Sequence, residues 1–246
     1  MRIHVLLLAA VALVLASQSA AAFTDLTLNV TVQLNPDGTA HVIEESRISL
    51  DSMAEIDTFT SSMAAIGTTI EDWRKLTNSA NIRYHTTAVP VNTNLAPKMA
   101  GSIAVIMIEY DTSEPLVSID KETARKSSYT LDQNRFNFQT SRTGALVLPQ
   151  GTTLSVVLPQ DAILMNAIPQ PTSVDGRTYT WRGPFTIARF DFSYERQQSL
   201  GTEVSEFFSD VGHTMSGFLG TALGGLTIVI IVLALLVLGL MRRHSS

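Results

Sequence analysis

The chain has 246 residues, 45% of them hydrophobic, and carries 22 acidic against 17 basic side chains, a net charge of −5. An acidic chain lacks the basic face that phosphate binding needs, so we expect no nucleic acid among its partners. The absence of cysteine excludes thiol nucleophiles, thiolate metal sites and disulfides, which a domain of this size does not need for stability.

Residues 1–22 have the pattern of a cleavable signal peptide. Arg2 supplies the positive start, an apolar run extends to Ala16, and three alanines at 20–22 offer small residues for cleavage before Phe23. The alternative is an uncleaved anchor helix, for which the apolar run is short. We therefore predict an exported protein whose mature chain begins at Phe23.

The first mature segment, residues 26–50, predicts a β-hairpin. Apolar residues alternate strictly in its first half, at Leu26, Leu28, Val30, Val32 and Leu34. Residues 35–38, Asn-Pro-Asp-Gly, form a strong turn signal, and a second strand follows. Glu44 and Ser46 share the apolar face of this second strand by parity. A bulge or an edge strand would explain them, and a buried functional Glu44 is the alternative.

A single apolar stripe at helical spacing covers residues 53–76. Its members are Ile56, Phe59, Met63, Ile66, Ile70, Trp73 and Leu76. Asp51 and Ser52 are candidate N-caps. Gly67 and the two threonines after it weaken the middle, so a break into two helices is the alternative to one helix. We expect the stripe to pack on a sheet.

The remaining residues up to 198 predict mainly β-structure. Strands are expected at 82–89, 102–110, 135–139, 145–148, 153–158, 177–181 and 185–194, the last irregular near Phe190. The segment 102–110 is nearly all apolar, as in a strand buried on both faces, whereas 91–101 and 111–126 are expected to be loops. The predicted fold class for residues 23–198 is a β-dominated α+β domain, a sheet or sandwich with one packed amphipathic helix.

Several motifs at both ends of this domain are shared with a known group of proteins. They are Asp37-Gly38 followed by Val42 and Glu44, then Leu158-Pro159, Ile168-Pro169-Gln170-Pro171, Asp175-Gly176 and Trp181-Arg182-Gly183-Pro184. In these motifs the chain resembles uncharacterised prokaryotic, mostly archaeal, exported single-pass membrane proteins. The resemblance implies a β-rich extracellular domain that ends in a short hairpin before the membrane. It implies no activity and no functional residues.

Signals for catalysis and metal binding are sparse. Residues 118–121 fit the S-x-x-K pattern of Ser–Lys acylating enzymes, but the motifs that accompany it in such enzymes are absent. His41, His85 and His213 stand in no metal-binding pair, and we expect them to face solvent.

Two pairs of alternating carboxylates could bind calcium or belong to a glycosidase cleft. They are Glu109 with Asp111 and Asp120 with Glu122. Neither pair has the dense oxygen array and turn glycine of a calcium loop, so we interpret both as solvated strand ends. We therefore predict no catalytic, cofactor-binding or metal-binding residue, and no enzyme.

The chain contains one N-x-[ST] sequon, Asn29-Val30-Thr31. It follows the predicted cleavage site and would face the outside, where such sequons are glycosylated. It lies inside the first predicted strand, with Asn29 on the polar face by parity. Asn29 is therefore a candidate glycosylation site.

Residues 199–241 predict a membrane-proximal helical segment, 199–218, that continues into a transmembrane helix, 219–241. The second segment is almost wholly apolar and uncharged, and its 23 residues reach about 34 Å against a hydrocarbon core of about 30 Å. Arg242 and Arg243 follow at once and favour a cytoplasmic stub, residues 242–246. Residues 2, 242 and 243 aside, 14 basic and all 22 acidic side chains remain, so the part predicted to lie outside has a net charge of −8. The predicted topology is single-pass type I in the cell membrane.

Small residues recur every four positions where the chain is predicted to enter the membrane. They are Gly212, Ser216, Gly220 and Gly224. This spacing lets two helices approach closely, so the row is a candidate helix–helix interface, and mere tolerance of glycine is the alternative. The leading hypothesis is a surface protein with a non-enzymatic interaction ectodomain, which forms a homodimer or joins a multi-pass partner through this helix. The alternatives are an accessory subunit of a multi-pass transporter or secretion complex, and an envelope hydrolase.

Overall fold

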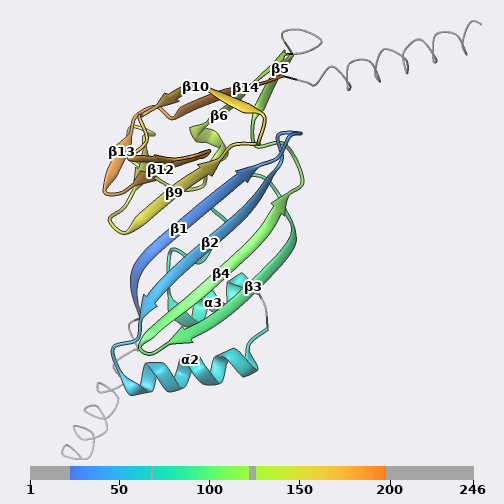
Figure 1. Ribbon diagram of the computed structural model, residues 1–246. Coiled ribbons are helices and arrows are strands. Elements are labelled where there is room, and N and C mark those ends of the chain that lie inside the picture. Colours follow the sequence, from blue (N-terminus) through green and yellow to red (C-terminus); the bar gives the residue numbers. More distant parts are fainter. Residues whose placement is uncertain (1–22, 68, 122–125, 198–246) are drawn as a thin grey trace, which may run out of the picture. The chain divides into compact units, whose positions relative to one another are not determined.

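The computed structural model describes residues 23–67, 69–121 and 126–197, and all of these except Lys126 and Gln197 fall in the same unit (Figure 1). Within these ranges no helix is long and apolar enough to span a bilayer. The predicted signal peptide, membrane-proximal segment, transmembrane helix and stub lie outside the described residues, as does His213.

A seven-stranded sheet, called here the large sheet, forms the centre of the unit. Its order is β11-β12-β9-β1-β2-β4-β3, and all neighbours are antiparallel except β1 and β9. The strands are β1 (Thr24–Leu34), β2 (Ala40–Ser49), β3 (Pro90–Ala100), β4 (Ile103–Thr112), β9 (Thr152–Val157), β11 (Ser173–Asp175) and β12 (Thr178–Arg182). The predicted hairpin of residues 26–50 is confirmed as β1 and β2, paired from Thr24↔Ser49 to Leu34↔Ala40.

Two smaller sheets complete the β-structure. The small sheet has the order β10-β14-β6-β5, with β5 (Ser118–Lys121), β6 (Lys126–Asp132), β10 (Ala162–Ile168) and β14 (Asp191–Gln197). A three-stranded sheet contains β7 (Gln139–Thr140), β8 (Leu146–Leu148) and β13 (Phe185–Ile187), and a 3-10 helix, η1, spans Gln133–Arg135. The prediction of a β-dominated α+β domain is confirmed.

The large sheet is packed on one face, called here the inner face. Every second residue is buried in β1 from Leu28 onward and in β2, β4 and β9, and most of the residues between them are half-exposed. This alternation contradicts the prediction that residues 102–110 are buried on both faces. The small sheet packs at one end of the inner face through an aromatic cluster: Tyr179, Trp181, Phe190, Phe192. Each fully buried large side chain of this kind stabilises the fold by about 1.5–3 kcal/mol.

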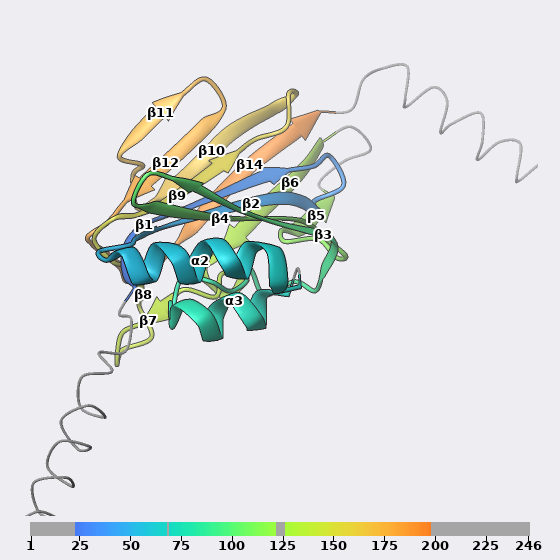
Figure 2. The same ribbon diagram turned by 90° about the horizontal axis from the view of Figure 1, so that it is seen from below.

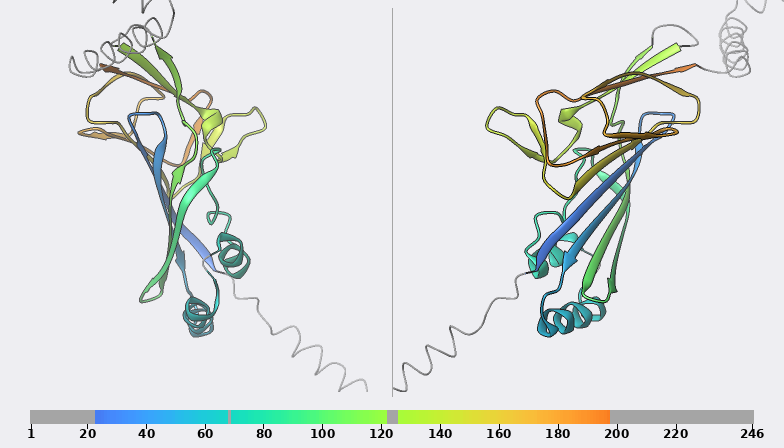
Figure 3. Two further views of the ribbon diagram at one scale, coloured as in Figure 1. Left: turned by 90° about the vertical axis from the view of Figure 1, so that its right-hand side faces the viewer. Right: turned by 60° about the vertical axis from the view of Figure 1, so that its left-hand side comes forward.

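Two helices, α2 (Met53–Ala65) and α3 (Ile70–Thr77), lie next to each other at the other end of the large sheet (Figures 2 and 3). Ser52 caps α2 in a reciprocal capping box with Glu55, as predicted for the N-cap. The apolar stripe packs inward through Phe59 and Trp73, whose rings are 5.1 Å apart. One continuous helix over 53–76 is therefore wrong, and the alternative of a break near Gly67 is correct.

Several strand predictions fail at particular residues. Residues 82–89 form no strand beyond one bridge, Thr86↔Phe136. The predicted loop 91–101 is instead the edge strand β3, which tolerates Pro90 and Pro97 because an edge needs fewer backbone donors. Part of the other predicted loop, 111–126, forms β5, and β10 has no counterpart in the sequence prediction. The predicted strand 185–194 divides into β13 and β14 around buried Phe190, where the alternation is irregular.

Candidate functional site

Glu44 lies in the middle of the inner face with only 1% of its surface exposed. Its strand, β2, is interior to the large sheet, and its one register shift against β1 falls at Asp25/Thr27, far from Glu44. Both the bulge and the edge-strand explanations of this residue are therefore wrong. The period-two alternation of β2 places the carboxylate among apolar neighbours, as the parity argument for a buried Glu44 anticipated.

Three donors surround the Glu44 carboxylate. The backbone N–H of His85 donates to Oε1 over 2.8 Å, and the Tyr110 hydroxyl donates to the same oxygen over 2.7 Å. His85 Nδ1 lies 2.7 Å from Oε2. Charge-assisted bonds of this kind are the strongest hydrogen bonds in proteins, and together they offset much of the cost of burying a carboxylate.

Each partner of Glu44 reaches it from a different element. Tyr110 projects from β4, where Val42↔Tyr110 and Glu44↔Ile108 are paired, so it is the diagonal cross-strand neighbour of Glu44. His85 comes from the segment between α3 and β3, which crosses the inner face after Asn78 ends α3 in a left-handed conformation. The neighbouring Thr86 hydroxyl lies 3.0 Å from the Tyr110 hydroxyl and completes the cluster.

The protonation pattern of the cluster follows from its contacts. His85 Nε2 lies 3.5 Å from Arg83 Nε, which can only donate. Nε2 is therefore assigned as the acceptor and Nδ1 as the donor to Glu44. Burial, reinforced by the Glu44 charge, raises the pKa of Tyr110 above its ordinary value of 10.0, so its hydroxyl keeps its proton and donates.

This cluster is sealed from solvent. His85 is 1% exposed, its ring lies 5.0 Å from that of Phe138, and the Tyr84 ring meets Tyr110 edge-on at 4.9 Å. The prediction that His85 faces solvent is wrong. The geometry supports a positioning role, in which Glu44 fixes the segment around His85 onto the sheet, because a substrate would reach the carboxylate only after that segment opened.

A second polar cluster lies on the opposite face of the large sheet, called here the outer face. His41 stands between two carboxylates, with Nε2 3.0 Å from Glu109 and Nδ1 2.8 Å from Asp111. A hydrogen bond from Asn92, followed by the contact with His41, lowers the pKa of Asp111 below its ordinary value of 3.8. Glu109 and Asp111 are about two-fifths exposed, as expected for solvated strand residues.

The other predicted site residues fall at separate places. Asn29 lies on the outer face of β1, half-exposed and paired with Glu45 and Thr153 of the adjacent strands. Ser118 and Asp120 are exposed on β5, and Glu122 lies outside the described residues. The candidate helix–helix interface (Gly212, Ser216, Gly220 and Gly224) also lies outside them. Within the described ranges, no group of three or more metal-ligating side chains is positioned to hold a metal ion.

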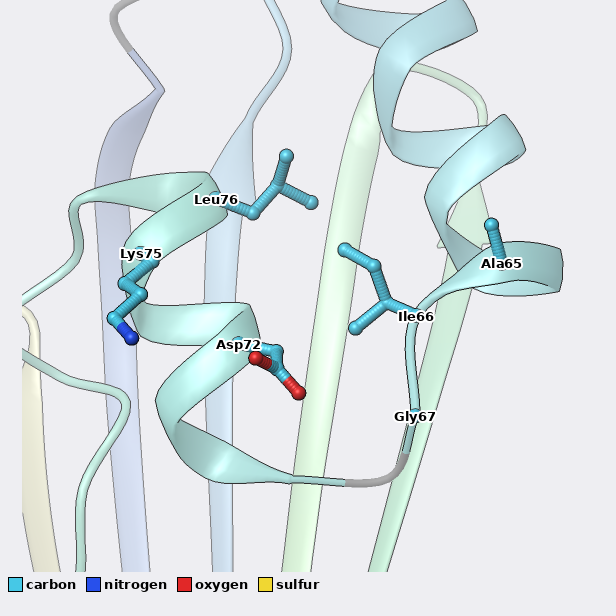
Figure 4. A pocket seen from close by; sticks show the side chains of 6 residues that line it. All are labelled: Ala65, Ile66, Gly67, Asp72, Lys75 and Leu76. Carbon is cyan, nitrogen blue, oxygen red and sulfur yellow. The ribbon is translucent and has the colours of Figure 1, made fainter.

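A shallow depression separates α2 from α3 (Figure 4). Ile66 and Leu76 point toward each other from the two sides, while Lys75 points away. Asp72 belongs to its lining, and its carboxylate is engaged by the Thr69 hydroxyl of the helix cap. The depression is open to solvent and brings together no set of groups that would bind a ligand.

The sequence could locate Glu44 but not its partners. Alternation along β2 marked Glu44 as an unusual residue on an apolar face, whereas residues 82–89 were predicted to form a strand on which His85 would face solvent. His85 lies 41 residues and Tyr110 lies 66 residues from Glu44, so the fold alone brings them together.

Comparison with known proteins identifies no family for this chain. No family model and no curated protein matches it. Among solved structures, the chain is similar to the folded domain of LppM from Mycobacterium tuberculosis, determined by NMR. That match has a TM-score of 0.36 and 6% sequence identity, and it covers 74% of this chain and 95% of that chain.

Proposed function

We propose that the chain is an exported, single-pass type I membrane protein whose β-rich ectodomain is a non-enzymatic interaction module. The observation that carries this proposal is the asymmetry of the large sheet. Its inner face is packed and the buried charged cluster around Glu44 is fully engaged, while its outer face is largely half-exposed over β1, β2, β4 and β9. A mostly antiparallel sheet with one packed and one solvated face presents a broad surface.

The outer face has the composition of a recognition surface. Strands β1 and β9 contribute neutral polar side chains such as Thr31 and Thr153, and β4 contributes apolar ones such as Met107. Strand β2 contributes apolar Ile43 beside the ion pair of Glu45 with Arg47. The His41 cluster adds charge at one end of the same face. Mixed polar and apolar surfaces of this kind are typical of protein interfaces that form reversibly.

Topology is the first test of this proposal. Mass spectrometry of the mature protein should find Phe23 at the N-terminus, and protease added to intact cells should remove the ectodomain while sparing residues 242–246. Extraction with alkaline carbonate should leave the chain in the membrane fraction. Retention of Met1 together with a protected ectodomain would contradict the proposed topology.

A second candidate function is an accessory subunit that holds a multi-pass transporter or secretion complex. The row of small residues from Gly212 to Gly224 supports it, because such rows also let a single span pack against a larger helical bundle. Purification of the full chain in mild detergent distinguishes the candidates. A stoichiometric multi-pass protein in the eluate favours the accessory subunit, and the chain alone or self-associated favours the interaction module.

A further inference from the structure

Strand β10 is an exposed apolar edge. It forms one end of the small sheet, and within the described residues no strand pairs with its free side. Its seven residues, Ala-Ile-Leu-Met-Asn-Ala-Ile, include no charge and no proline. Three apolar side chains are largely exposed: Ile163 at 58%, Met165 at 55% and Ile168 at 41%. Such an edge offers unpaired backbone groups and apolar surface to an incoming strand.

The other long or exposed edges of the described sheets are protected. Strand β3 carries Pro90, Pro97 and Lys98, and β5 has only four residues, among them Asp120. Strands β7, β11 and β13 have three residues or fewer. Proline, charge and shortness are the devices by which proteins prevent edge pairing. On β10 the one such device is a bulge at Met165, which leaves that side chain in solvent.

We propose that a second copy of this chain adds its own β10 to this edge as an antiparallel strand. A two-fold axis makes such a pair self-complementary, because each copy offers the same strand to the other. Pairing β10 with itself brings no like charges opposite each other. Asp161, just before the strand, is held by Arg196 of the same chain through contacts of 2.9 and 2.7 Å, so its charge is compensated within each copy.

The end of the described chain is compatible with this partner, in a step that rests on the proposed membrane tether. Strand β14 pairs with β10 and ends at Gln197, and residues 198–218 lead to the predicted span. Self-pairing of β10 places the two β14 strands three strand spacings apart, about 14 Å. Residues 198–218 reach about 32 Å even if helical, enough to join both copies to one membrane. Tethering raises the effective concentration of the second copy.

A cysteine scan tests the pairing directly, because the full chain has no cysteine of its own. Seven single variants, Ala162→Cys through Ile168→Cys, are oxidised in native membranes and compared on non-reducing gels. In two antiparallel strands related by a two-fold axis, a residue next to the axis lies opposite its own copy. For each position by which a residue lies further from the axis, it and its copy are about 7 Å further apart along the strands. Disulfides need Cα atoms within about 7 Å. The dimer band should therefore peak at one position within β10 and fall to background about two residues away.

A charge introduced on β10 should show whether the dimer band reports strand pairing or chance collision of two copies. Ile163→Lys, or Met165→Lys if position 163 itself gives the strongest band, is introduced into the variant with that band. It should weaken the band by about fivefold or more, because lysine protects strand edges. Val89→Lys is the matched control, since Val89 is 63% exposed outside β10, and it should leave the band unchanged. Tryptophan fluorescence of both variants should show unaltered unfolding transitions.

Three results would overturn the assignment of a second copy. They are a band no stronger than that of Val89→Cys at every position, an equal band at all seven positions, and cross-linking to a different protein alone. The membrane tether is judged separately by carbonate extraction. A chain that carbonate releases would refute the tether, while the scan would still report whether β10 pairs.

Discussion

A carboxylate taken from water into a protein interior loses hydration worth several kcal/mol, and Glu44 shows how hydrogen bonds replace it. Two of its three donors belong to His85 and the third is the Tyr110 hydroxyl, which its raised pKa keeps protonated. Because every donor is itself buried, loss of any one leaves charge that water cannot reach. Removal of any one donor should therefore lower the free energy of unfolding.

Two buried tyrosines provide a matched test of this argument. Tyr110→Phe removes the donor to Glu44 and should lower the free energy of unfolding by about 1–3 kcal/mol. The Tyr194 hydroxyl is buried and has no hydrogen-bond partner among the described residues, so Tyr194→Phe should be neutral or stabilising by up to about 1 kcal/mol. Denaturant unfolding of the mature chain, followed by fluorescence of buried Trp73 and Trp181, measures both. Equal destabilisation by the two substitutions would contradict the proposed role of Tyr110.

At the scale of elements, local sequence signals predicted an element well where one signal dominated. Strict alternation and an Asn-Pro-Asp-Gly turn identified the β1–β2 hairpin, and the apolar stripe identified the helical region. Strand β3 was missed because proline and asparagine are typical of loops, although an edge strand accepts them. Strand β10 has no alternating polar residues, and its place at the edge depends on β14, which follows 23 residues later.

The turn between β1 and β2 is expected to tolerate replacement of its glycine by alanine less well than an exposed turn of similar conformation. Gly38 has φ +86°, and a Cβ there would lie 2.7 Å from Val117 Cγ2. Gly176 has φ +55°, and no heavy atom lies within 4 Å of its would-be Cβ. Both substitutions by alanine cost about 1–2 kcal/mol from the left-handed backbone, but Gly38→Ala should add a packing cost of about 1–3 kcal/mol.

Thermal unfolding of the two variants under identical conditions measures this difference. Gly38→Ala should melt at a clearly lower temperature than Gly176→Ala. Because the extra cost comes from the approach of Val117 to the turn, Val117→Ala in the Gly38→Ala background should recover part of the loss. Equal melting temperatures for the two single variants would show that the neighbouring segment yields without cost.

At the scale of the whole molecule, three aspartates make the free energy of unfolding depend on pH. The pKa of Asp37 is lowered first by the Thr39 hydroxyl, that of Asp111 by Asn92, and that of Asp161 by Arg196, each from 3.8. A carboxyl with a lowered pKa in the folded state contributes stability above its unfolded pKa, and loses it as the pH falls through the folded value. We therefore expect nearly constant stability from pH 7 to 5 and a decline below about pH 4.

Removing one partner isolates one of these contributions. Arg196→Met should flatten the decline below pH 4 by a small amount, because Asp161 is exposed enough for solvent to screen its ion pair. Unfolding midpoints measured at pH 6 and pH 3 give the comparison with the unmodified chain. A decline that is as steep without Arg196 as with it would exclude Asp161 as a contributor.

The two contacts inferred for self-association constrain each other. A closed dimer has a single two-fold axis, and two parallel spans in one membrane require that axis to lie along the membrane normal. Antiparallel β10 strands are related by an axis perpendicular to their length. Both contacts therefore occur in one dimer only if β10 lies along the membrane plane. If β10 stands upright instead, the two contacts join different pairs of copies, and cross-linking at both positions should give ladders rather than one dimer band.

The last prediction is that the predicted transmembrane helix associates through the row from Gly212 to Gly224, which the described residues do not include. Four residues advance about 400° around a helix, so this row keeps to one side. Between helices in lipid there is no hydrophobic driving force, so association depends on close backbone packing, which small residues permit. Two helices would then cross near Gly220. Gly220→Ile adds bulk there without shortening the apolar span, and it should abolish disulfide cross-linking of a Ser216→Cys variant in native membranes.

Gly239→Ile is the matched control, because position 239 lies about 100° away from Gly220 around the helix, and it should leave the band intact. If Ser216→Cys gives no dimer band, or if Gly220→Ile leaves that band unchanged, the row does not form a dimer interface.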